Sequence, residues 1–186
     1  MKRAALLIGA LAGPVLPAGA AQAANPHRVE IAFNRFYDYE DLVGQFRRLH
    51  EAYPALTRLE PIGKTHEGRD LWILTIANGK TGPEERKAAM WIDGNVHGNE
   101  VQGGEAALYA AWYLLDNYGR IETVTRLVDE RAFYVLPSQN PDGRAHWFAA
   151  ANDPNSSRSG LRPLDNDRDG VADEDGPDDL DGDGNL

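Results

Sequence analysis

The chain is organised around an apolar strand that breaks into a turn rich in glycine and asparagine. Residues 88–92 are predicted to form the strand, and the turn after it contains Gly94, Asn95, Gly98 and Asn99. Polar side chains that follow a strand lie at the carboxyl end of a sheet, where open α/β proteins bind their ligands. The sequence therefore predicts a functional site at this turn.

The turn presents His97 and Glu100 immediately before a helical pattern that starts at Val101. An imidazole and a carboxylate three residues apart can direct a ring nitrogen and an oxygen toward one cation. With a further histidine and an open position, they make the ligand set of a catalytic zinc site. The alternative is a solvated polar turn, because this spacing also arises by chance in many helices.

Strand-like and helix-like patterns alternate along the chain, which favours an α/β fold. Apolar periodicity predicts helices at 39–53, 101–117 and 121–130, and strands at 57–62, 71–77, 88–92 and 131–136. The first two strands flank a short turn and are typical of a hairpin, and residues 140–143 are a second strong turn signal. The predicted architecture is a mixed, largely parallel sheet flanked by helices on both faces, incomplete at the C-terminus.

Residues 1–23 have the features of a secretory signal peptide. Lys2 and Arg3 precede an apolar run over 4–15, and Ala21 and Ala23 supply the small residues of a cleavage site. The apolar run is too short for a transmembrane helix. We expect cleavage after Ala23 and a secreted or periplasmic protein without membrane attachment. The chain has no cysteine, so no disulfide supports its core.

The acidity of the chain is confined to its last residues. The formal net charge is −10, and residues 165–186 hold nine Asp, one Glu and one Arg, a net of −9. The other 164 residues therefore sum to about −1. No basic stripe is available to neutralise phosphates, which argues against a nucleic-acid partner.

The acidic segment, residues 164–186, resembles an Asp-rich calcium loop. Oxygen ligands fall at the first, third, fifth and ninth loop positions, which are Asp165, Asp167, Asp169 and Asp173. Gly170 occupies position six, where a calcium loop turns sharply, but Gly176 replaces the bidentate Glu of an EF-hand. The pattern begins again at Asp179. We expect calcium binding; the alternative is a solvated acidic insertion.

Four motifs together resemble the zinc metallocarboxypeptidases related to carboxypeptidases A and B. They are a helix ending at Tyr53-Pro54, the hairpin turn at 62–69, the turn at 94–100 and the turn at 140–143. We expect residues 24–163 to be the N-terminal part of such a catalytic domain. The resemblance implies an eight-stranded mixed sheet, zinc bound by His97 and Glu100, and removal of C-terminal residues from peptide or protein substrates.

In that family an arginine stabilises the oxyanion that forms during hydrolysis. Arg158 lies at roughly the family's distance after the turn at 140–143, and Arg162 is a second candidate. The alternative for both is a solvated loop arginine. Glu105 is expected to be solvated or helix-capping. The family's third zinc ligand, general base and carboxylate-binding residues match no position up to Leu186. We therefore expect this chain alone to be inactive.

Two other functions remain open at this stage. The first is an amidase or cell-wall peptide hydrolase built on the same zinc scaffold. The second is a non-catalytic, secreted calcium-binding module in which His97 and Glu100 have lost their role.

Overall fold

The computed structural model describes residues 27–149, 163, 165 and 168–172. The elements are α1 (Tyr39–Ala52), β1 (Thr57–Lys64), β2 (Asp70–Ile76), the 3-10 helices η1 (Gly79–Thr81) and η2 (Glu84–Arg86), β3 (Ala88–Asp93), α2 (Gln102–Asn117), α3 (Glu122–Glu130), β4 (Arg131–Leu136) and α4 (Pro141–Ala149). The predicted signal peptide lies outside the described residues. No described helix is long and apolar enough to cross a bilayer.

The sheet is mixed, as predicted, and its strand order is β1-β2-β4-β3. β1 and β2 form the expected antiparallel hairpin, β2 pairs antiparallel with β4, and β3 pairs parallel with β4. The expectation of a largely parallel sheet is wrong for the described strands, since two of their three pairings are antiparallel. A tight turn can join only antiparallel strands, whereas β3 and β4 are joined through α2 and α3, which supply the long crossover that a parallel pair needs.

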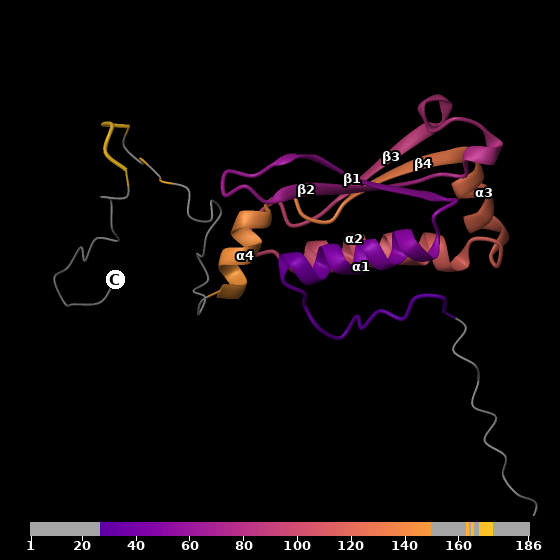
Figure 1. The fold of residues 1–186 in the computed structure, drawn as a ribbon, viewed down its shortest axis with the longest axis horizontal. Helices are drawn as coiled ribbons and strands as arrows, with labels where there is room; N and C mark the ends of the chain where they lie inside the picture. The colour runs from indigo at the N-terminus through magenta and orange to yellow at the C-terminus, as the bar shows by residue number, and fades with distance from the viewer. Residues whose placement is uncertain (1–26, 150–162, 164, 166–167, 173–186) are drawn as a thin grey trace, which may run out of the picture.

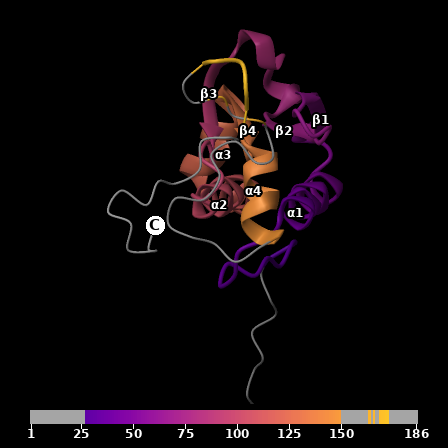
Figure 2. The same ribbon diagram turned by 90° about the vertical axis from the view of Figure 1, so that its left-hand side faces the viewer.

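The two long helices cover the same face of the sheet. α1 and α2 lie side by side beneath the strands in Figure 1, and the turned view in Figure 2 places both on that side. α1 packs against β1 and β2, and α2 packs against β3 and β4. Within residues 27–149 the prediction of helices on both faces is therefore wrong, because only one crossover is present and α1 packs beside it.

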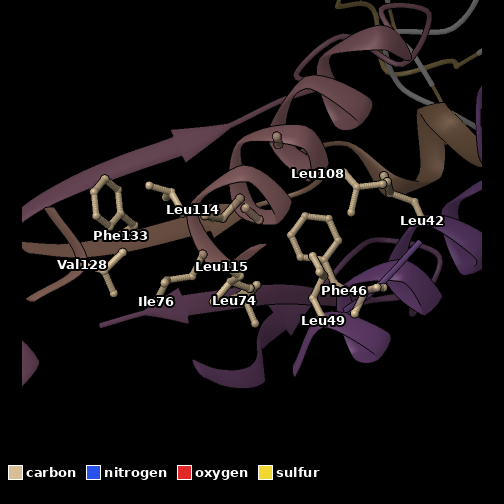
Figure 3. Packing of buried hydrophobic residues seen from close by; sticks show 14 of the residues in the cluster. Leu42, Phe46, Leu49, Leu74, Ile76, Leu108, Leu114, Leu115, Val128 and Phe133 are labelled. Carbon is tan, nitrogen blue, oxygen red and sulfur yellow. The ribbon is translucent and has the colours of Figure 1, made fainter. Parts of the chain in front are cut away.

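The core lies between these helices and the sheet (Figure 3). Its fully buried apolar side chains come from α1, β2, α2, α3 and β4, and include Leu42, Phe46, Leu49, Leu74, Ile76, Leu108, Leu115, Val128 and Val135. The helical spacing of apolar residues in α1 turns one face toward the sheet. Asp38 caps α1 by accepting a hydrogen bond from the Asp41 N–H at 2.8 Å.

The second turn signal, at 140–143, is also the start of a helix. α4 begins at Pro141, and the Asn140 side chain accepts from the Gly143 N–H at 2.8 Å. An Asn cap followed by Pro at the first helical position is a favourable start for a helix. The sequence pattern does not predict α4, because the apolar residues of this helix have no helical period.

Strand β3 is an edge strand within the described sheet and carries exposed apolar side chains. Met90 and Trp91 are 56% and 52% exposed. An uncovered edge with apolar side chains is a site where another strand or chain can pair.

Phe46→Ala should lower the free energy of unfolding by about 3–5 kcal/mol, because Phe46 is completely buried between α1 and the sheet. Urea unfolding followed by circular dichroism measures the change. The matched control is Phe36→Ala, since Phe36 is 48% exposed and should change stability much less. Equal losses for the two variants would contradict the core described above.

Candidate metal centre

His97 and Glu100 lie in the loop between β3 and α2, at the carboxyl end of β3. The His97 Nδ1 and Glu100 Oε2 atoms are 3.0 Å apart, and the Glu100 N–H donates to the His97 carbonyl at 3.1 Å. The pair is close enough for an ion contact, yet among the described residues the buried Nδ1 atom has no partner in hydrogen-bonding geometry. The loop thus brings together a nitrogen and an oxygen atom that can both bind a metal ion.

The separation of these two atoms suits one zinc ion. Zn–N and Zn–O bonds of about 2.0–2.2 Å in a tetrahedron place two ligand atoms about 3.3 Å apart. The observed 3.0 Å is within a small side-chain rotation of that value. The remainder of a catalytic ligand set is not assembled: the described residues contain no group of three His, Cys, Asp or Glu side chains placed to hold a metal ion.

The buried side chain of Asn95 hydrogen-bonds to the backbone of this loop. Its backbone adopts φ 54°, in the left-handed region, and its side chain is buried. Asn95 Nδ2 donates to the carbonyls of His97 at 2.7 Å and Gly98 at 3.3 Å. Its Oδ1 accepts from Ser138 at 3.1 Å and from Arg144 at 3.2 Å. One side chain therefore sets the path of the backbone that presents His97.

Glycines allow the loop to lie directly against two helix starts. A Cβ at Gly94 would be 2.1 Å from the Gly103 carbonyl oxygen, and one at Gly143 would be 2.8 Å from the Gly98 Cα. Both distances are too short for any side chain. Glycine is therefore required where the loop meets α2 and where it meets α4.

Arg144 and Glu105 form a buried ion pair next to the loop. The Arg144 Nη2 and Glu105 Oε1 atoms are 2.5 Å apart, and Arg144 is fully buried. Glu105 also accepts from the Tyr37 N–H at 2.9 Å. Burial lowers the pKa of the Arg144 guanidinium, and Glu105 opposes that shift. The expectation of a solvated or capping Glu105 is therefore wrong, because the sequence did not show that α4 places a cation over the start of α2.

Asp142 ties the hairpin turn to α4. Its carboxylate accepts from the Thr65 hydroxyl at 2.7 Å, from Arg69 Nη1 at 2.7 Å and from the Glu67 N–H at 3.1 Å. Burial alone would raise the pKa of Asp142, but these hydrogen bonds outweigh it and the pKa lies below its ordinary value of 3.8. The hairpin turn at 62–69 and the turn at 140–143, two of the four sequence motifs, therefore contact each other through Asp142.

The other predicted site residues lie in the acidic segment or just before it. Asp165 accepts from the N–H groups of Arg168 at 2.6 Å and Gly170 at 3.0 Å, and Asp169 accepts from the Val171 N–H at 2.8 Å. Arg158 and Arg162 lie outside the described residues, as do Asp167 and Asp173. The calcium and oxyanion roles stay predictions.

A family model described as zinc carboxypeptidase matches residues 43–170, more than two thirds of the chain. The chain belongs to the zinc carboxypeptidase family. The match includes the hairpin, the His97–Glu100 loop and the start of α4. The family's metal is zinc, which agrees with the donor set of the loop.

Relatives and solved structures agree with this membership. The carboxypeptidase N catalytic chain of Rattus norvegicus is 36% identical over 124 residues, 66% of this chain and 27% of that protein. Carboxypeptidase D of Drosophila melanogaster is 35% identical over 130 residues, 63% of this chain and 9% of that protein. The structure of carboxypeptidase A from Helicoverpa armigera matches with a TM-score of 0.57 at 25% identity, over 70% of this chain and 31% of that one. The chain therefore spans less than a third of each of these relatives.

Asp142→Asn should destabilise the protein by about 1–3 kcal/mol at pH 7, through loss of charge-assisted hydrogen bonds. The folded-state pKa is lowered, so the contribution is fully present above the ordinary pKa of 3.8 and is lost as pH falls through the folded-state value. Urea unfolding from pH 7 to pH 3 measures the difference between the two proteins, which should shrink below about pH 4.

The control for this series is Asp41→Asn, on the exposed face of α1, where the side chain is 59% exposed. This change should be nearly neutral across the same pH range. A stability loss in Asp142→Asn that stays constant down to pH 3 would show that the carboxylate charge is not what holds the hairpin turn.

Proposed function

We propose that this chain supplies part of the catalytic domain of a zinc metallocarboxypeptidase, which removes C-terminal residues from peptides or proteins. His97 and Glu100 would be two of its zinc ligands. The observation that carries the proposal is the convergence of His97 Nδ1 and Glu100 Oε2, 3.0 Å apart at the carboxyl end of β3, in a member of the zinc carboxypeptidase family.

The chain's own residues would hold the ion at a fixed point beside the sheet. When bound, zinc lowers the pKa of a coordinated water toward neutrality and polarises the carbonyl of the scissile bond. His97 would bind through its imidazole and Glu100 through its carboxylate, whose negative charge neutralises part of the charge of the ion. Arg158, with Arg162 as the alternative, is the proposed donor to the oxyanion.

The proposed location is outside the cytoplasm, secreted or periplasmic, on the strength of the signal-like residues 1–23. Peptides and proteins in that compartment would be the substrates. An amidase or cell-wall peptide hydrolase on the same scaffold is the nearest alternative. In a form of the protein that hydrolyses peptides, a panel of peptides with free and amidated C-termini separates the two, because only a carboxypeptidase requires the free carboxylate.

The purified 186-residue chain should bind zinc weakly, through His97 and Glu100, and should not release C-terminal residues from peptides. Two ligands hold an ion but do not fix the geometry that catalysis requires. Calorimetry with zinc and a peptidase assay test both statements. His97→Ala should weaken zinc binding at least tenfold, whereas the control His66→Ala, in the exposed hairpin turn, should not.

Two results would contradict this proposal. One is zinc binding by His97→Ala that is as tight as that of the unchanged chain, which would place the ion elsewhere. The other is robust, zinc-dependent release of C-terminal residues by the 186-residue chain, which would require a catalytic set that its described residues do not form.

We also propose that Asp165, Asp167, Asp169 and Asp173 bind calcium. Clustered carboxylates repel one another until a divalent ion neutralises them, and calcium accepts a wider range of oxygen geometries than the strict octahedron of magnesium. Kd should be roughly 10⁻⁴ to 10⁻³ M, because no bidentate Glu closes the loop. Calorimetry of the unchanged chain and of the double variant Asp167→Ala, Asp169→Ala measures it. Identical traces at millimolar calcium would leave the segment as a solvated acidic insertion.

A further inference from the structure

Arg144 contacts both ends of the segment that carries the proposed zinc ligands. Its Nη1 atom donates to Asn95 Oδ1 at 3.2 Å and to the Val101 carbonyl at 2.7 Å. Asn95 lies just before His97 in the chain, and Val101 lies just after Glu100. One nitrogen therefore links the entry and the exit of the loop.

The guanidinium is held equally firmly on its other side. Nε donates to the Tyr37 carbonyl at 3.0 Å, and Nη2 contacts that carbonyl and Glu105 Oε1. A Cβ on Gly104 would lie 2.7 Å from Nη1, so α2 approaches the guanidinium closely at this glycine. Arg144 is therefore held by hydrogen bonds to Tyr37 and Glu105 as well as to the loop.

From this arrangement we propose that Arg144 is a positioning residue for the zinc ligands. By joining Asn95 to Val101 it fixes the distance between the two ends of the loop, and so the distance between His97 Nδ1 and Glu100 Oε2. The inference rests on the proposed function of His97 and Glu100.

Arginine can do this where lysine cannot. A guanidinium presents its donors in a rigid plane, whereas a lysine ammonium is a single point on a flexible stem. Lysine at this position would keep the charge for Glu105 but could not reach Tyr37, Asn95 and Val101 together. Buried ion pairs add little net stability compared with apolar packing, so geometric control is the better account of a charge buried here.

Without the hydrogen bonds from Arg144 to Asn95 and Val101, the loop should relax and the distance between His97 Nδ1 and Glu100 Oε2 should increase. Substitution of a group that orients a metal ligand through hydrogen bonds typically lowers the metal affinity 10–100-fold. Arg144→Lys should therefore weaken binding of zinc by about tenfold or more. The hydrogen exchange of residues 95–101 should accelerate as well, and that of α3, at the far end of the sheet in Figure 1, should not.

The test uses the full chain and three variants, which are Arg144→Lys, Asn95→Gly and the double variant. Glycine accepts the φ of 54° at position 95, so Asn95→Gly removes the side-chain bonds while keeping the backbone path. Zinc calorimetry, the absorption spectrum of bound cobalt and hydrogen exchange are measured at a temperature where each variant is folded. Arg126→Lys, on the exposed side of α3, is the matched control.

If Arg144 acts through Asn95, the double variant should lose less zinc affinity than the product of the two single losses. A general loss of stability would not produce this coupling. If Arg144→Lys binds zinc as tightly as Arg126→Lys does, while His97→Ala loses binding, the proposed role of Arg144 is overturned and the proposed function of His97 is not. Failure of the unchanged chain to bind zinc, or full binding by His97→Ala, would overturn the proposed function and the inference together.

Discussion

Backbone hydrogen bonds join the segments that follow β3 and β4, and the loop that carries the proposed zinc ligands, residues 94–101 (the metal-site loop), starts from them. The N–H groups of Gln139 and Asn140 donate to the carbonyls of Gly94 and Asn95 at 3.0 and 3.2 Å. The loop therefore leaves the sheet alongside the segment that becomes α4. Because the two segments are paired before they diverge, a polar turn that could otherwise fluctuate has a defined starting direction.

The polar groups behind the loop are buried, and each needs a partner for that burial to be tolerable. Asn95 Oδ1 accepts from both Ser138 and Arg144, and Glu105 Oε1 balances the charge of Arg144. These bonds give the buried side chains one preferred arrangement, because breaking any of them would leave a buried polar group without that partner. The glycines at 94, 103 and 143 contribute in a different way, by allowing backbones to touch. The loop is thus positioned by contacts on the side away from solvent.

Helices cover one face of the sheet, whereas the edge strand β3 keeps exposed apolar side chains. α1 and α2 bury the face they share, while Trp91, on β3 beside Tyr134 of β4, stays half exposed. In a family whose relatives are more than three times longer than the matched part of this chain, an apolar strand edge is a natural place for further structure to pack. The metal-site loop lies at the end of this same strand, so the open edge and the proposed site are neighbours.

The amino-acid sequence alone predicts the elements with clear periodicity and places His97 and Glu100 directly after a strand. Local patterns suffice there, because side-chain spacing and turn residues act over a few positions. The proposed ligand pair was predicted for the same reason, and the tertiary structure adds the 3.0 Å approach of its donor atoms. The strand order, the single covered face and the burial of Arg144 are visible only in the folded protein. Those depend on pairing between distant segments: nothing near position 144 shows that Glu105, Asn95 and Tyr37 will surround it.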